Sequence, residues 1–329
     1  MHFKTVCNKR KAFLTLGFFF IFCFGINSQN QRRLDSLESV YVSRKYDQRD
    51  KLEILKELAM NLTDSEKKLF FSEALIQNAR AMDSMNYLFQ GLMEKGSALR
   101  LKSDLTEALE TYFLGAKLVG EQKHSRQLGV LHTGIADVYA IMGNHANAFK
   151  YYQSAIRILR EAKDSLNEAN ALSNIGDLHA NMGQLDSALS YTREAEAIFK
   201  KIKYKLGLAY TLGNTGMIYA KMGNNLGAEE NMNEAIKLLE DLHEYYPIAV
   251  YLKFIADIYL EKGDEHTALN YAFESLELAH QYGMKKEVSE AYLQLSKIYE
   301  HAGKLPESYQ YYKNHITYKD SVNNIVSVQ

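Results

Sequence analysis

The stretch from Leu172 to Ala188, LSNIGDLHANMGQLDSA, decides the fold because its pattern returns every forty residues. Each copy has a central glycine, an aromatic residue or His four positions before it, and a small residue five positions after it. The central glycines are Gly143, Gly183, Gly223, Gly263 and Gly303. A fixed period of this length is typical of a stacked repeat protein. We therefore expect one quasi-linear array in which each copy contacts its neighbours.

Each copy has the pattern of two helices joined by a tight turn. Around Gly183, the apolar residues Leu172, Ile175 and Leu178 recur at spacings of three and four, which predicts one helix over 168–182. The glycine can adopt the left-handed conformation that ends a helix. A second helix is expected from about residue 185 to 201.

Small residues recur where the two helices of a copy would approach each other. Ala188 and Ala195 in the second helix leave room for the first, and Gly176 and Gly216 do the same from within first helices. Glycine costs roughly 0.5 to 1 kcal/mol inside a helix, so a packing reason is needed for it there.

Two prolines and no tryptophan in 329 residues favour an all-α protein. The register extends backward to Ser103 and, more weakly, to Thr63, giving about seven hairpins. We expect a signal peptide over 1–28, a capping helix and a degenerate repeat over 29–85, an array of about six hairpins over 86–319 and a tail over 320–329.

The first residues have the three-part layout of a secretion signal. Four basic residues are followed by an uncharged run of 15 residues, 12–26, and then by the polar residues 27–30. The run is shorter than the roughly 20 residues that span a bilayer, so cleavage near Ser28 is favoured over permanent anchoring. The expected location is periplasmic or at the cell surface, with inner-membrane anchoring if the leader is not cleaved.

Composition excludes several classes of function. Both cysteines, Cys7 and Cys23, lie in the leader, so the mature chain has no thiol for catalysis or for a Cys-ligated metal. Removing the leader leaves 35 Lys and Arg against 40 Asp and Glu, which argues against nucleic acid as a partner. Catalytic and phosphate-binding motifs do not occur, so we expect no enzyme activity, no cofactor and no metal.

The residues from Leu172 to His179, with Gly183 and Ala188, resemble the tetratricopeptide repeat. The resemblance covers about residues 86–318 and implies a right-handed α-solenoid of stacked antiparallel helix hairpins. The period of forty differs from the common 34, and no proline closes the second helix. Longer helices result, as in the repeat arrays of kinesin light chains and quorum-sensing regulators.

A finer resemblance is to exported tetratricopeptide proteins of the Bacteroidetes type, carried by residues 34–37 and 318–321. Such arrays often form the input region before a membrane helix and a histidine kinase, a nucleotide cyclase or a DNA-binding module. Two readings therefore stay open. The chain is a non-catalytic exported scaffold that binds a protein or peptide in its concave groove, or it is the sensor region of a signalling receptor.

The resemblance places the binding groove on the first helices and suggests which residues face it. An Asn side chain both donates and accepts hydrogen bonds, so a row of them can hold an extended peptide. Asn174 and Asn214 are the first candidates. Aspartates six positions before the central glycine would add a negative stripe suited to a basic peptide, interrupted by two lysines. These residues are Asp137, Asp177, Asp257, Lys253 and Lys221.

Other recurring residues have a structural interpretation. The tyrosines four positions before the glycine are expected to pack in the core. These are Tyr139, Tyr219, Tyr259 and Tyr299. His132 and His179 replace Leu or Tyr of other copies and are expected to be partly buried. The apolar residues Ile325, Val326 and Val328 suggest self-association through the C-terminal end.

Overall fold

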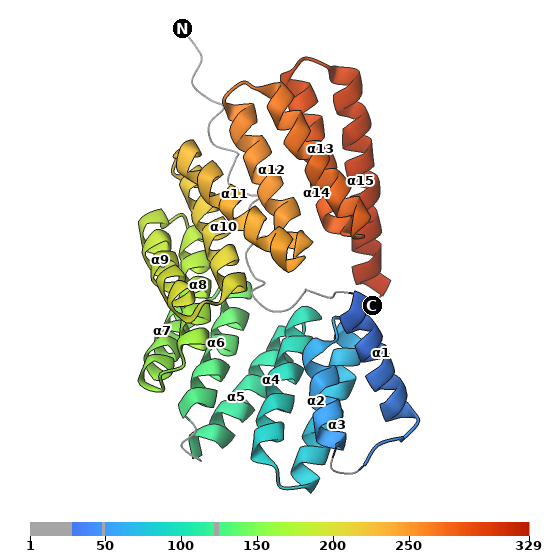
Figure 1. Ribbon diagram of the computed structural model, residues 1–329, viewed down its shortest axis with the longest axis vertical. Helices are drawn as coiled ribbons and strands as arrows, with labels where there is room; N and C mark the ends of the chain where they lie inside the picture. The colour runs from blue at the N-terminus through green and yellow to red at the C-terminus, as the bar shows by residue number, and fades with distance from the viewer. Residues whose placement is uncertain (1–27, 48–49, 122–124, 329) are drawn as a thin grey trace. The chain divides into compact units, whose positions relative to one another are not determined.

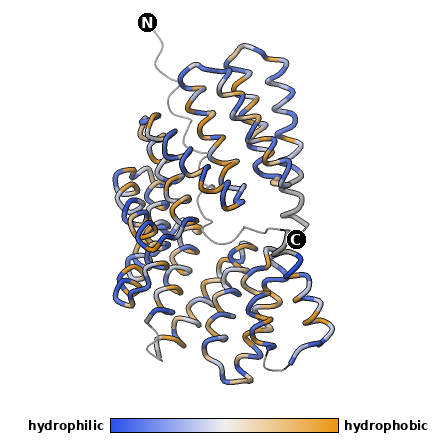
Figure 2. The backbone as a smooth tube through the Cα atoms, in the orientation of Figure 1, coloured by the Kyte–Doolittle hydropathy of each residue, from blue (hydrophilic) through white to orange (hydrophobic). Residues whose placement is uncertain are grey.

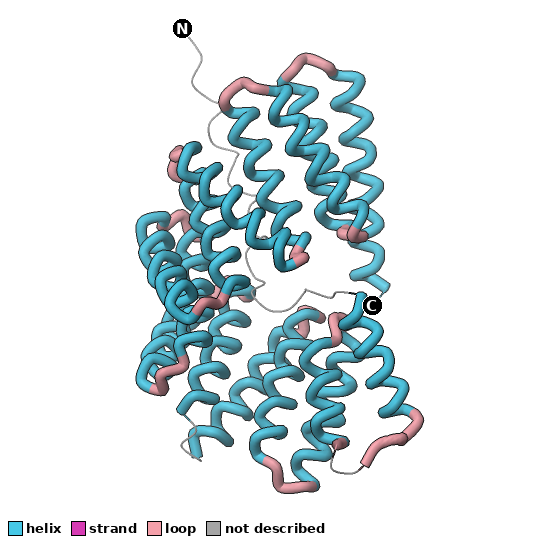
Figure 3. Tube along the Cα trace, viewed as in Figure 1, coloured by secondary structure: helices cyan, strands magenta, loops and turns pink. Residues whose placement is uncertain are grey.

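The computed structural model describes the backbone of residues 28–47, 50–121 and 125–328, and the side chains of 32–47, 50–120 and 126–320. Over these ranges every regular element is a helix (Figure 3). The leader expected over 1–28 lies outside the described residues except for Ser28. The expectation of an all-α fold is confirmed.

The chain divides into two compact units, 1–198 and 199–329, with the boundary inside α9 (Figure 1). The first unit and the shared helix contain α1 (Ser28–Val42), α2 (Lys51–Asn61), α3 (Ser65–Ala81), α4 (Met85–Leu101), α5 (Leu105–Glu121), α6 (Ser125–Ile141), α7 (His145–Glu161), α8 (Ser165–Asn181) and α9 (Leu185–Ile202). The second unit contains α10 (Lys205–Lys221), α11 (Asn225–Leu242), α12 (Tyr245–Glu261), α13 (Glu265–Gln281), α14 (Lys285–His301) and α15 (Leu305–Val328). Helix α15 thus continues through most of the segment 320–329 that the sequence set apart as a tail.

Helices pair in the order of the chain, with an even-numbered first helix and an odd-numbered second helix in each hairpin. Each first helix also contacts the next first helix, from α2 through α4 and α6 to α8 in one unit, and from α10 through α12 to α14 in the other. Second helices pack on the first helix of the following copy, as α7 does on α8 and α13 on α14. Within each unit the hairpins are therefore stacked as a repeat array.

The five central glycines all have left-handed backbones, with φ between 72° and 77°. Each ends a first helix, as expected, because a residue with a Cβ is disfavoured there by about 1 kcal/mol or more. Second helices end in the same conformation without needing glycine, at Lys163, Lys203 and His243. These turns have no glycine signal in the sequence, since among these four second helices only the one that ends at Gly283 carries a glycine at this position.

Gly176 and Gly216 lie where helices approach closely, which confirms their spacing role. A Cβ at Gly216 would meet Met232 Cγ at 2.7 Å and the Ala228 carbonyl oxygen at 2.9 Å. A Cβ at Gly176 would meet Thr192 Oγ1 at 2.7 Å.

Four of the five aromatic residues before the central glycines pack on a second ring from the following helix. Tyr139 stacks on Tyr151, and Tyr299 stacks on Tyr311, with ring centroids 5.8 and 5.3 Å apart. Equivalent stacks join His179 to Tyr191 and Tyr259 to Tyr271. The four tyrosines are half-buried, and Tyr139 and Tyr259 pack against core clusters. The partial burial expected for His132 and His179 is confirmed.

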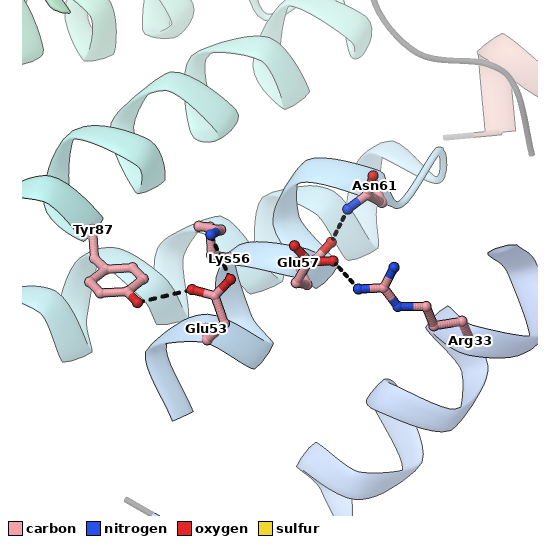
Figure 4. A network of polar contacts seen from close by, with 6 residues as sticks. All are labelled: Arg33, Glu53, Lys56, Glu57, Asn61 and Tyr87. Atoms are coloured by element: carbon pink, nitrogen blue, oxygen red, sulfur yellow. Dashed lines mark hydrogen bonds and ion pairs between the residues drawn. The ribbon is translucent and has the colours of Figure 1, made fainter. Parts of the chain in front are cut away.

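Helix α1 covers α2 with an apolar side and leaves a polar side in solvent. Leu34 is buried, whereas Arg33 reaches Glu57 of α2 at 2.7 Å (Figure 4). On the same helix, Glu53 pairs with Lys56 and accepts a hydrogen bond from Tyr87 of α4. Exposed ion pairs of this kind contribute at most about 1 kcal/mol each, so the buried leucine dominates the attachment of α1.

Polar and apolar residues alternate along the described helices (Figure 2). Among the residues that the structure describes, none of the helices combines the length and the hydrophobicity that crossing a bilayer requires.

Candidate binding face of the first helices

In the first unit, the predicted residues Asn174 and Asp137 are in direct contact. Asn174 Nδ2 on α8 donates a hydrogen bond to Asp137 Oδ1 on α6 at 3.0 Å. The same carboxylate accepts a hydrogen bond from the Tyr152 hydroxyl on α7 at 2.6 Å. Asp137 thus links three helices, and Asn174 uses one of its two amide hydrogens within the protein.

The carboxyl group of Asp137 is held in an unusual electrostatic setting. Burial raises its pKa, while Arg100 and the hydrogen bonds from Tyr152 and Asn174 oppose that shift. Burial and the neighbouring Asp137 charge also raise the pKa of Tyr152, so the phenol keeps its proton and remains a donor. Asp137 therefore has a structural role, and its contact with a ligand stays a prediction.

The second unit repeats this contact with different residues. Gln294 Nε2 on α14 donates to Asp257 Oδ1 on α12 at 3.0 Å, and to the backbone carbonyl of Lys253 at 2.6 Å. The ammonium of Lys253 lies 3.5 Å from Glu290. Asp257 keeps exposed surface, yet the helices that surround its carboxyl group desolvate it enough to raise its pKa. The hydrogen bond from Gln294 and the charges of Lys253 and Lys297 oppose this shift.

Both contacts join residues 37 positions apart, which is the repeat of forty less one helical turn of three. The amide residue stands nine positions before its central glycine, and the aspartate stands six before the glycine of the preceding copy. Equivalent positions of successive first helices are therefore in register within each unit. Each unit thus has one amide–carboxylate pair at equivalent repeat positions, and we call the amides and carboxylates at these positions of the first helices the polar row.

The remaining predicted residues also lie on first helices, but the exposure of their side chains differs. Asp177 on α8 has 2% of its surface exposed and Asn214 on α10 has 5%, whereas Asp257 is exposed. Lys253 and Lys221 are half-buried. Asn174, Lys253 and Asp257 thus have the accessible surface for a ligand contact, and the role of the whole set stays a prediction.

Three further polar residues on these helices were not predicted from the sequence. Gln294 stands at the register position of Asn174 and Asn214, so its amide could have been found by aligning the copies. Asn170 and Ser173 on α8 are buried, and Asn170 Oδ1 and Ser173 Oγ lack hydrogen-bond partners among the described residues. Buried polar groups are normally paired, which makes this part of α8 unusual.

The side-chain chemistry available on the described helices is that of hydrogen bonding and charge. In the described part of the chain, no group of three or more His, Cys, Asp or Glu residues has an arrangement that could hold a metal ion.

Known proteins share this architecture at low sequence identity. Residues 127–201 match the family model of the tetratricopeptide repeat. The search of curated proteins finds no match. Among solved structures, a Rap protein complexed with competence and sporulation factor is 12% identical, with a TM-score of 0.58 over 91% of this chain and 99% of the other.

Two further structures are similar to the same extent. BtubC from P. vanneervenii is 17% identical, with a TM-score of 0.56 over 68% of this chain and 91% of its own. The quorum sensor NprR from B. thuringiensis is 15% identical, with a TM-score of 0.52 over 89% and 99%. Likenesses at this identity concern the fold. Residues 127–201 thus match the tetratricopeptide repeat, and the forty-residue pattern and the stacked hairpins extend the same helical repeat architecture beyond them.

Proposed function

We propose that this chain is a non-catalytic exported scaffold that binds an extended peptide or protein segment along the first helices. The observation that carries the proposal is the polar row, in which contacts of identical spacing keep the amides and carboxylates of successive copies in register. An extended peptide presents backbone N–H and C=O groups at regular intervals, so a regular row of side-chain donors and acceptors suits it.

The exposed and half-buried members of the row indicate which ligand groups would bind. Asn174 keeps a second amide hydrogen and a carbonyl oxygen beyond the hydrogen it gives to Asp137. In the second unit, Asp257 offers a carboxylate to solvent, with Lys253 and Glu290 beside it. Within the first unit, Asn174 would bind a peptide main chain. Within the second unit, Asp257 would contact a basic side chain.

The proposal can be tested by peptide selection and two substitutions. The chain from residue 29 is immobilised, peptides from a displayed random library are selected, and their affinities are measured by fluorescence anisotropy. We expect Asn174→Ala and Asp257→Asn to weaken binding by about five- to tenfold each, the loss of roughly 1 to 1.4 kcal/mol that a removed hydrogen bond or charge contact produces.

A matched control separates binding from folding. Asn231 on the second helix α11 bonds to the carbonyl of Gly227 in its own helix, so Asn231→Ala should leave peptide affinity unchanged. Circular dichroism checks that each variant is folded. Unchanged affinity in a folded Asn174→Ala chain would refute the asparagine contact, and a library that yields no binder would refute the scaffold proposal.

A receptor input region is the second candidate, favoured by the resemblance of residues 34–37 and 318–321 to exported sensor arrays. The same polar row would then receive the signal molecule, and a separate module would carry the output. Genomic sequence around the coding region tests this. A reading frame that continues into a membrane helix and a kinase or cyclase would favour the receptor.

Export is part of the proposal and rests on the leader pattern in residues 1–28. Expression of the full chain in a bacterial host, followed by N-terminal sequencing of the periplasmic fraction, measures cleavage directly. A mature N-terminus near residue 29 is expected, and a full-length cytoplasmic chain would contradict it.

A further inference from the structure

Helix α15 exposes a continuous apolar stripe to solvent. Its members lie at spacings of four, three and four residues, which places them on one side of the helix. The stripe consists of Leu305, Tyr309, Tyr312 and Ile316, with 64%, 66%, 47% and 36% of their surfaces exposed.

Comparison of α15 with the second helices of the earlier copies indicates the nature of this apolar stripe. The position of Tyr312 is occupied in the earlier copies by residues that are 98% or more buried. These are Tyr112, Tyr152, Thr192, Met232 and Ala272. In those copies the second helix is covered by the first helix of the next copy, as α13 is by α14. At Tyr312 the stripe therefore lies on the surface that the earlier copies use for stacking.

The orientation of α15 is fixed by contacts on its inner side. His315 is buried, and its Nδ1 lies 2.8 Å from the Ser289 carbonyl oxygen on α14. Ser308 Oγ lies 3.1 Å from Ser296 Oγ on the same helix. Since the polar contacts and the stack of Tyr311 on Tyr299 hold this side against α14, the helix cannot turn its apolar stripe inward.

The N-terminal end of the array differs in character. There α1 turns polar residues outward, including Arg32, Arg33 and Asp35, as a terminal cap of a repeat array normally does. Head-to-tail stacking of two chains would place the apolar stripe of α15 against this polar side, which disfavours an open filament. An isologous contact between two C-terminal ends avoids that mismatch.

We propose that α15 pairs with α15 of a second copy of this chain in an antiparallel, two-fold dimer. A stripe with spacings of four, three and four reads the same in both directions. Antiparallel pairing therefore places Leu305 opposite Ile316 of the second copy, and Tyr309 opposite Tyr312, as a two-fold contact requires. The stripe itself carries no charge, and the exposed Lys313 and Lys319 lie beside it.

This surface is distinct from the polar row and does not depend on the proposed peptide binding. It is also built from residues other than Ile325, Val326 and Val328, whose side chains lie outside the described set. A single helix pair buries less than the roughly 1,200 Å² of a standard interface, so we expect a dissociation constant in the micromolar range.

Sedimentation velocity of the chain from residue 29, measured from about 1 to 200 μM, tests the proposal. We expect a monomer at the low end and a dimer at the high end. Tyr309→Lys combined with Tyr312→Lys should weaken dimerisation by at least about tenfold, because it places lysines in the contact. Phe70→Lys is the matched control, since Phe70 is an equally exposed aromatic residue on α3, and it should leave the dimer unchanged.

Cysteine cross-linking tests the two-fold geometry, because the chain from residue 29 contains no cysteine of its own. A mixture of Leu305→Cys and Ile316→Cys chains should form mixed disulfides, whereas Ile316→Cys alone should form few. Efficient cross-linking of Ile316→Cys with itself would indicate parallel helices and overturn the proposed pairing.

A chain that stays monomeric to 200 μM would overturn the dimer altogether. In that case a synthetic peptide of α14, residues 285–301, is added to the monomer. Its binding measures whether the stripe accepts a helix of the first-helix type. Binding of that peptide at one per chain, abolished by the double lysine variant, would assign the stripe to a foreign helix and contradict a second copy as occupant.

Discussion

Substitution of Gly216 by alanine tests the close approach of helices that the repeat requires. A Cβ built at Gly216 lies 2.7 Å from Met232 Cγ and 2.9 Å from the Ala228 carbonyl oxygen. Met232 is fully buried. The carbonyl oxygen belongs to the backbone of α11, so it cannot move without displacing the helix. The equivalent residue of the next copy, Ala256, tolerates its methyl group because it packs in a cluster with the small Ala272.

The size of the effect follows from two opposing terms. Forcing one additional methyl group into a packed core costs about 1 to 3 kcal/mol. Replacing glycine by alanine inside a helix stabilises the helix by roughly 0.5 to 1 kcal/mol. We therefore expect Gly216→Ala to lower the free energy of unfolding by about 1 kcal/mol, equivalent to a fall in Tm of roughly 2 to 4 °C.

Thermal and urea unfolding followed by circular dichroism at 222 nm measure this change. Gly120 on α5 provides the control, because a Cβ there meets nothing within 4 Å. Gly120→Ala should therefore raise the free energy of unfolding by up to about 1 kcal/mol. If Gly216→Ala were as stable as the natural chain, or if both substitutions shifted Tm in the same direction, the packing argument would be refuted.

Three further predictions concern buried charge and the repeat turns. Lys68→Met leaves Glu94 without the ammonium 2.5 Å away, so a loss of about 3 to 5 kcal/mol is expected in urea unfolding, and Lys68→Met with Glu94→Leu should recover much of it. Burial raises the pKa of Asp137 in the folded chain above its value in the unfolded chain. The stability that this carboxyl group contributes is therefore fully present below the unfolded-state pKa, and it is lost as the pH rises through the folded-state pKa. Asp137→Asn should therefore gain in Tm relative to the natural chain as the pH rises above the ordinary Asp pKa of about 3.9, and a constant difference would contradict this. Gly223→Ala, at φ 77°, should cost about 1 kcal/mol through backbone strain alone, with no change in helix content by circular dichroism.

Much of the fold could be predicted because its signals are local. A glycine that ends a helix acts through its own backbone, and an alanine or glycine that lets two helices approach acts within one hairpin. The turns at Gly143 and Gly183 and the close contact at Gly216 therefore follow from spacing along the chain. The turns at Lys163 and Lys203 could not be predicted, because residues with ordinary side chains adopt the left-handed conformation there under the constraint of packing.

The candidate site was predicted less completely. The register of Asn174, Asp137 and Asp257 followed from the repeat, but their partners lie 37 residues away or on a different helix. Whether an amide faces solvent or a neighbouring carboxylate depends on how successive first helices stack. Gln294 was missed because only Asn174 and Asn214 carry Asn at this position and the residue varies among the other copies, although the contact it makes is the same.

The sequence by itself determined the architecture, since a forty-residue period can bury its apolar faces only by stacking one copy on the next. Tertiary structure decided which recurring polar residues are used in holding the copies together and which reach solvent. It also decided that Tyr312 of α15 is exposed, because the residues at its position in the earlier copies are buried where the next first helix packs, and no described helix covers Tyr312 in this way.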